Sequence, residues 1–139
     1  MIRVTVFCIV LLAQPSLAEV RHLPAPRAQV CDDMGFAMIF QEMAHREDLL
    51  HAANLSPQDE GKAAAIVADF ESRFRELSDA LDQGVLTRRQ FGEQRDKLAR
   101  ITRAKLRAAL SPPGSIRLEK FVREQIARIR ANAVQPQEV

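Results

Sequence analysis

The chain has 139 residues, of which 47% are hydrophobic and 27% are charged, and its formal net charge at neutral pH is +2. This composition is typical of one ordered, soluble domain and unlike that of a disordered or membrane-spanning chain. The glycine-rich patterns that hold phosphates in P-loop proteins and in dinucleotide-binding folds do not occur in the sequence, which excludes both classes.

The N-terminus is typical of an export signal. Arg3 precedes an apolar run over residues 4–13, and the small residues Ser16 and Ala18 follow. A membrane anchor is the alternative, but a spanning helix needs about 20 apolar residues and this run is half as long. We therefore expect residues 1–18 to be a signal peptide that is cleaved after Ala18, which leaves a periplasmic protein without a membrane span.

Cleavage would leave 121 residues and would remove Cys8, so that Cys31 becomes the only cysteine. In an oxidising compartment a single cysteine is a free thiol, a soft metal ligand or half of an interchain disulfide. Residues 19–30 contain two prolines and little periodicity, and they predict a flexible leader. A helical domain is expected over 31–133, followed by a disordered polar tail over 134–139.

Helical spacing begins at Asp32, which is predicted to cap a first helix that runs to about Asn54. The apolar residues of this helix share one face: Phe36, Ile39, Phe40, Met43 and Leu50.

The segment Leu55-Ser56-Pro57 is a strong signal for the start of a second helix. Ser56 is suited to the N-cap, and Pro57 lies at the first helical position, where a missing N–H costs nothing. Gly84 is suited to the left-handed position that ends the helix. The apolar stripe between these ends comprises Ala63, Ile66, Val67, Phe70, Phe74, Leu77 and Leu81.

A third helix is predicted to begin with a capping box, in which Thr87 and Gln90 each bind the backbone N–H of the other. Leu86 can pack against Phe91 as a hydrophobic staple. The apolar stripe of this helix comprises Phe91, Leu98, Ile101, Leu106 and Ala109. Residues 110–114 contain two prolines and a glycine and separate it from a last helix. The apolar face of the last helix comprises Leu118, Phe121, Val122, Ile126 and Ile129.

No segment alternates apolar and polar residues with a period of two, so we expect an all-α fold. The two central helices, of about 27 and 23 residues, would be about 40 and 34 Å long. Such long helices predict an elongated helical hairpin of about four helices. Burying both apolar stripes is expected to need a second copy of the chain, which predicts an interlocked homodimer.

Charge is unevenly distributed along the chain. Residues 19–85 contain 13 acidic and 6 basic side chains, whereas residues 86–139 contain 13 basic and 5 acidic ones. Complementary packing of acidic against basic helices explains most of this asymmetry. The alternative is a cationic face for an acidic or unfolded client protein or an anionic membrane surface. The arginines of the third helix that would form such a face are Arg88, Arg89, Arg95, Arg100, Arg103 and Arg107. The export signal and the lack of stacking aromatic residues among these bases argue against nucleic acid.

Catalytic motifs do not occur in the sequence, and we expect neither an enzyme nor a cofactor. A soft-ligand face is the sharper hypothesis. Cys31, Met34 and Met38 fall on one side of the first helix, together with His45 and opposite the apolar face. Thiolate and thioether groups suit a soft ion such as Cu(I). We favour the alternative, in which the methionines are packing or interface residues and Cys31 links two chains.

The order of these signals resembles that of the Spy/CpxP family of periplasmic proteins, whose hallmark is a repeated L-T-x-x-Q motif. The related periplasmic heavy-metal sensor and resistance proteins share this layout. The resemblance extends over residues 31–130, and only Leu86–Gln90 matches the motif fully. The two Leu-Ser-Pro segments, at 55–57 and 110–112, match the motif only in part. They have Asp59 and Gly114 where glutamine is expected.

The resemblance implies a cradle-like dimer of interlocked helical hairpins. It also implies ATP-independent binding of unfolded client proteins, or inhibition of an envelope stress sensor. The nickel and cobalt sensors of the related branch would need histidine and methionine where this chain has Thr102 and Leu106, so that site is not expected here. Heavy-metal sensing through Cys31 and its neighbours is the alternative function.

Overall fold

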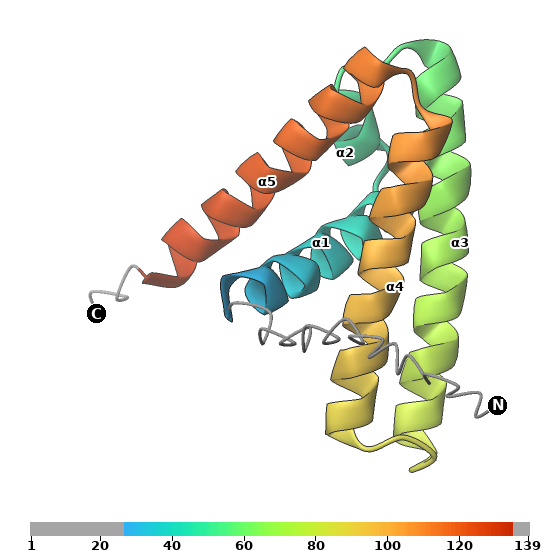
Figure 1. The fold of residues 1–139 in the computed structure, drawn as a ribbon, viewed down its shortest axis with the longest axis vertical. Coiled ribbons are helices and arrows are strands. Elements are labelled where there is room, and N and C mark those ends of the chain that lie inside the picture. Colours follow the sequence, from blue (N-terminus) through green and yellow to red (C-terminus); the bar gives the residue numbers. More distant parts are fainter. Residues whose placement is uncertain (1–26, 135–139) are drawn as a thin grey trace, which may run out of the picture.

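The computed structural model describes residues 27–134, and the side chains of residues 32–133. The described residues form five helices and no strand, so the predicted all-α class is confirmed (Figure 1). The helices are α1 (Arg27–His45), α2 (Glu47–Ala52), α3 (Pro57–Asp82), α4 (Arg88–Ala109) and α5 (Pro112–Val134). The predicted signal peptide, most of the leader and the tail beyond residue 134 lie outside the described residues.

The first helix differs from its prediction at both ends. It begins at Arg27, so that residues 27–30 of the predicted leader are helical and Asp32 is not a cap. The carboxylate of Asp32 instead pairs with two arginines of α5. The helix ends at His45, because Arg46 adopts an extended conformation with φ −131° and ψ 97°, and the short α2 follows. This interruption accounts for five helices where about four were expected.

The ends of the α3–α4 hairpin follow the sequence signals. The Oγ of Ser56 accepts a hydrogen bond from the backbone N–H of Asp59, and Pro57 begins the helix. Both bonds of the capping box between Thr87 and Gln90 are present, at 3.2 and 2.9 Å. Gly84 ends α3 with φ +73°, in the left-handed region that favours glycine. The two helices have 26 and 22 residues, close to the predicted lengths.

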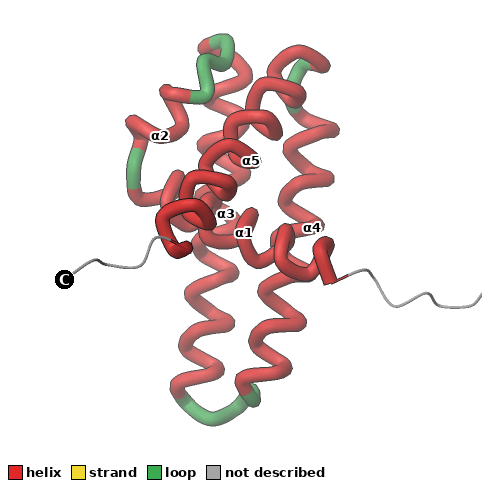
Figure 2. Tube along the Cα trace, turned by 90° about the vertical axis from the view of Figure 1, so that its left-hand side faces the viewer, coloured by secondary structure: helices red, strands yellow, loops and turns green. Residues whose placement is uncertain are grey.

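A row of aromatic rings joins α1 to this hairpin. The rings of Phe36, Phe40, Phe70, Phe74 and Phe91 follow one another with centroid separations of 5.5 to 5.9 Å. The Phe70 and Phe74 rings are stacked and the other pairs are tilted or edge-to-face, and such pairs stabilise a core beyond the area that they bury. Because α1 covers only part of the hairpin, the end that carries the α3–α4 turn projects beyond the other helices (Figures 1 and 2).

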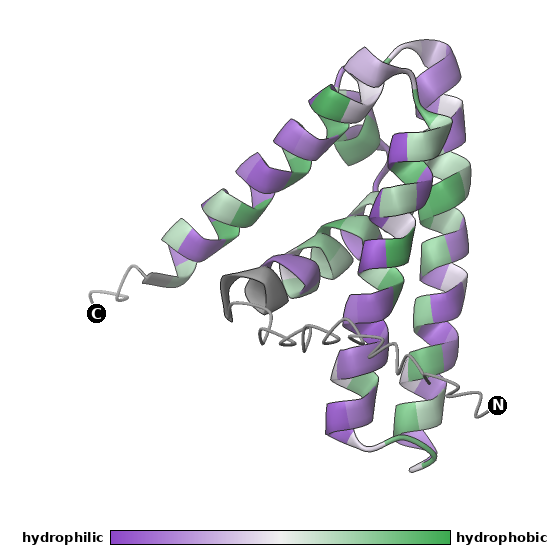
Figure 3. Ribbon diagram, in the orientation of Figure 1, coloured by the Kyte–Doolittle hydropathy of each residue, from purple (hydrophilic) through white to green (hydrophobic). Residues whose placement is uncertain are grey.

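α5 packs chiefly on α1 and diverges from the hairpin towards its C-terminus (Figure 1). Its Leu118, Val122 and Ile126 are buried. The side chain of Ile126 lies over Gly35, where an added Cβ would come within 3.0 to 3.1 Å of it. Glycine at this position therefore sets how closely the two helices approach. Figure 3 shows apolar residues along α1, between the more hydrophilic surfaces of α4 and α5.

One apolar residue of the predicted α4 stripe, Ile101, lies on a solvent-exposed face and not in the core. The side chain of Ile101 is 43% exposed, whereas Asp96, Ala99 and Thr102 are buried. The reason is the position of α1, which packs against the side of α4 that carries Ala99. Ile101 lies two residues further on and points about 200° away around the helix.

The two departures from the repeated motif meet in space. Ser111 is placed just before α5, and its backbone N–H donates to Oδ1 of Asp59 at 3.0 Å. Its hydroxyl donates to Oδ2 of the same carboxylate and accepts from the N–H of Gly114. These hydrogen bonds from Ser111 lower the pKa of Asp59. Asp59, from α3, therefore accepts the N-cap N–H that the glutamine at the fifth motif position accepts within one helix, and a side chain at Gly114 would overlap Asp59.

We predict that Gly114→Ala destabilises the chain by about 1–3 kcal/mol, since its Cβ would overlap the Asp59 carboxylate. Urea denaturation measures this change. Gly61→Ala is the matched control, because no atom lies within 4 Å of the added Cβ, and it should stabilise the chain by about 0.5–1 kcal/mol. In an Asp59→Ala background the cost of Gly114→Ala should shrink, and an unchanged cost would contradict the contact.

Candidate functional site

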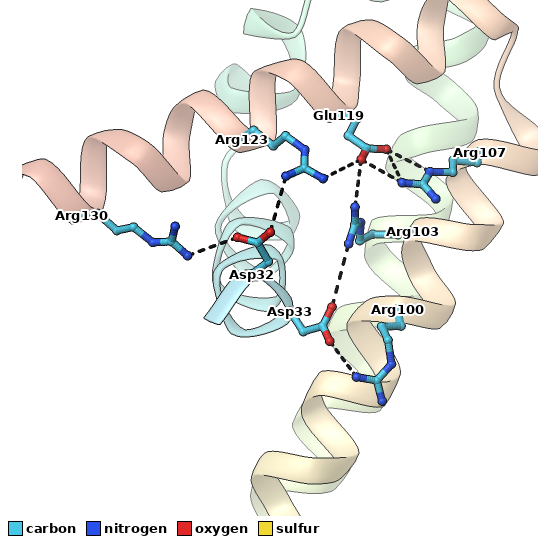
Figure 4. A network of polar contacts seen from close by, with 8 residues as sticks. All are labelled: Asp32, Asp33, Arg100, Arg103, Arg107, Glu119, Arg123 and Arg130. Carbon is cyan, nitrogen blue, oxygen red and sulfur yellow. Dashed lines mark hydrogen bonds and ion pairs between the residues drawn. The ribbon is translucent and has the colours of Figure 1, made fainter. Parts of the chain in front are cut away.

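Three arginines of α4, Arg100, Arg103 and Arg107, face acidic residues of neighbouring helices (Figure 4). Arg100 contacts the carboxylate of Asp33 at 2.7 Å, and Arg103 lies 3.9 Å from the other oxygen of that carboxylate. The Asp33 side chain is only 8% exposed. A buried carboxylate needs such partners to offset its loss of hydration.

Glu119 of α5 gathers three arginines. Arg103, Arg107 and Arg123 approach its carboxylate at 2.9, 2.8 and 3.2 Å. Burial alone would raise the pKa of Glu119, but the hydrogen bonds from Arg107, Arg103 and Arg123 outweigh burial and lower the pKa to about 2. Glu119 therefore stays ionised at any physiological pH and fastens α5 to α4.

A second acidic residue fastens α5 to α1. Asp32 lies 3.5 Å from Arg123 and 3.3 Å from Arg130 (Figure 4). Arg103 lies between Asp33 and Glu119, and its guanidinium carbon is 3.9 Å from the centre of the Phe36 ring. The contact is a cation–π interaction in a partly desolvated setting. Arg103 thus contacts α1, through Asp33 and Phe36, and α5, through Glu119.

The structure places the predicted cationic face in two kinds of environment. Arg100, Arg103 and Arg107 pair with acidic residues of other helices. The remaining arginines of that face lie nearer the turn: Arg95 pairs with Asp96, Arg89 with Glu93, and Arg88 is exposed. Packing between helices therefore accounts for the three arginines closest to the core. The charge asymmetry is evident in the sequence, but the acidic residues that pair with these arginines are not.

An apolar surface lies on the outer face of α1. Met34 and Met38 are 42% and 44% exposed, on the side opposite the buried Phe36 and Phe40. Met38 borders a groove with Ile39, Leu49 of α2 and Ile129 of α5, and Ile129 is itself 42% exposed. The polar rim of this groove comprises Gln41, Glu42, Arg46 and Gln125. We call Met34, Met38 and Ile129 the methionine surface.

Of the candidate metal ligands, Met34 and Met38 have described side chains and Cys31 does not. Cys31 lies in α1, but its side chain is outside the described part of the chain, as is any disulfide that it forms. His45 lies 3.2 Å from Glu71 of α3, and this contact links the end of α1 to the hairpin. Among residues 32–133, no three His, Cys, Asp or Glu side chains are grouped as a metal site would need.

The motif residues at the helix starts have structural positions. Leu55 is buried and Leu86 is half-buried, while Ser56, Thr87 and Gln90 form the caps described above. These residues therefore define where the two helices of the hairpin begin.

No family model, curated protein or solved structure matches this chain. None of the described helices combines the length and apolar character that crossing a lipid bilayer requires.

We predict that Glu119→Gln destabilises the chain by about 1–2 kcal/mol at pH 7, because an amide loses the charge-assisted hydrogen bonds with the three arginines. Partial solvent access keeps the loss at this size. The lowered pKa means that ionised Glu119 favours folding above its ordinary pKa of 4.5, and that this contribution is lost as the pH falls towards about 2.

Urea denaturation at pH 7 and near pH 2.5 should therefore give a smaller difference between wild type and variant at the lower pH. Glu124→Gln is the control, since Glu124 is half-exposed and meets Lys120 only at 4.0 Å. A difference that is the same at both pH values would contradict the role of the Glu119 charge.

Proposed function

We propose that this chain is a periplasmic, ATP-independent chaperone or envelope-stress modulator that acts as a homodimer and holds unfolded or partner proteins. The single observation that carries the proposal is the methionine surface. Met34, Met38 and Ile129 expose apolar groups on two helices, outside the buried core of the described residues. Exposed apolar groups that border a groove with a polar rim are typical of protein-binding surfaces.

The chemistry of this surface suits varied partners. Methionine is unbranched and polarizable, so Met34 and Met38 can adapt to differently shaped apolar side chains. The groove beside them also has Glu42 on its rim, where Arg46 is paired with Asp48 at 2.6 Å. Weak apolar contact with many sequences needs no nucleotide. The resemblance to the Spy/CpxP family supports the same proposal.

Inhibition of an envelope sensor is the other form of this function. It would use the same surface for one partner instead of many. The two forms differ in selectivity, since a chaperone should protect unrelated unfolded proteins and a modulator should bind only its own partner.

We predict that the purified chain suppresses aggregation of a reduced, unfolded model protein at equimolar dimer, measured by light scattering. Met34→Ser/Met38→Ser should lose at least about half of this suppression, because the exposed apolar area falls. Val85→Ser at the hairpin turn is the control, as Val85 is 70% exposed but remote from the methionine surface. Suppression that survives in the double variant would contradict the proposed surface.

Binding of a soft metal ion is the second candidate function. The observation that favours it is that two thioethers, Met34 and Met38, are exposed one helical turn apart and on the same side as Cys31 is expected. Thioether and thiolate ligands would select Cu(I) over harder ions.

A Met34→Leu/Met38→Leu variant separates the two candidates, because leucine keeps the apolar area and removes sulfur. Titration with Cu(I) should show binding to wild type and at least about tenfold weaker binding to this variant if the thioethers are ligands. The chaperone proposal instead predicts that the variant suppresses aggregation as well as wild type does. Equal Cu(I) affinity of the two proteins would contradict the metal site.

A further inference from the structure

A second groove lies along the α3–α4 hairpin. Its apolar lining is Leu77 of α3 with Leu98 and Ile101 of α4, and only these two helices contribute to it. The groove lies on the side of the hairpin away from α1, since Ile101 points away from the buried Ala99 that faces α1. None of the described helices other than α3 and α4 lines it.

Three charged residues border this groove, and one of them, Arg73 of α3, is paired with Asp69 of its own helix. Glu76 borders it from α3 and Lys97 borders it from α4. Among the described residues, neither side chain takes part in an ion pair, whereas the nearby Asp69 pairs with both Arg73 and Lys105. The rim thus holds one free acid and one free base on antiparallel helices.

We propose that a second copy of this chain docks on the hairpin groove, with a two-fold axis parallel to the hairpin. This rotation places α3 of each copy against α4 of the other. Glu76 of each copy then faces Lys97 of the other, which forms two equivalent ion pairs. Leu77, Leu98 and Ile101 of the two copies meet between these pairs.

The charge pattern favours a second copy over a client protein as the occupant. Two-fold symmetry requires a surface to complement itself, and a surface with one acid and one base on opposite sides does so. An unfolded client has no fixed charge pattern to match. The inference rests on the proposed homodimer and identifies the surface that forms it, and it leaves the methionine surface on α1 free for clients.

Sedimentation analysis of charge-reversal variants tests this surface. Wild type should be a dimer, and Lys97→Glu should weaken the dimer at least about tenfold, because it places two pairs of like charges in the interface. Glu76→Lys should have the same effect. The double variant Glu76→Lys/Lys97→Glu should recover dimerisation, since each pair is restored with its signs exchanged.

Lys120→Glu on α5 is the control and should remain dimeric, because Lys120 is 76% exposed and lies outside the hairpin groove. Circular dichroism confirms that each variant is folded. A monomeric wild type, a dimer that withstands both single reversals, or a double variant that stays monomeric would each overturn the inference. Aggregation suppression is measured separately, so a protein that dimerises through this groove without protecting clients contradicts only the proposed function.

Discussion

The arrangement of α1, α4 and α5 depends on the placement of Arg103 between two acidic residues and an aromatic ring. Arg103 belongs to α4, Asp33 and Phe36 to α1, and Glu119 to α5. Its side chain is only 17% exposed, so the guanidinium would be costly to bury without partners on both sides. Removing either acid would leave a buried cation with fewer partners. This constraint explains why the three helices meet as they do.

The same pairing shapes the surface that remains for other molecules. Arg100, Arg103 and Arg107 are held by Asp33 and Glu119, so their charge is largely compensated within the chain. Exposed apolar groups remain on α1 and in the hairpin groove, and among the described residues Arg88, Glu76 and Lys97 are exposed without an ion pair. Binding through these surfaces depends on buried apolar area, with charge setting orientation at the rim. A protein of this design would hold partners of many sequences more readily than it would select an anionic one.

Local signals in the sequence were sufficient for part of the fold. Ser56, Thr87, Gln90 and Gly84 act on residues within a few positions of themselves, and the helix ends that they predict are present. The exposure of Met34 and Met38 opposite the buried face of α1 also follows from helical periodicity alone. Such features need no knowledge of the tertiary structure.

Contacts between distant residues could not be predicted in the same way. The bond between Asp59 and Ser111 joins positions 52 residues apart, and in the sequence alone Asp59 is only a departure from a motif. The exposure of Ile101 depends on which side of α4 receives α1, and periodicity does not decide this. The extended Arg46 that divides α1 from α2 also interrupts a region where the apolar spacing continues.

Binding of other proteins is assigned above to apolar surfaces and not to free arginines. The most direct test is the salt dependence of capture of an unfolded model protein between about 0.05 and 0.5 M NaCl, a range over which exposed charges become screened. The account predicts that capture keeps its affinity across this range while the free energy of unfolding of the chain itself decreases. A steep loss of capture with unchanged stability would contradict it and would assign binding to the arginines.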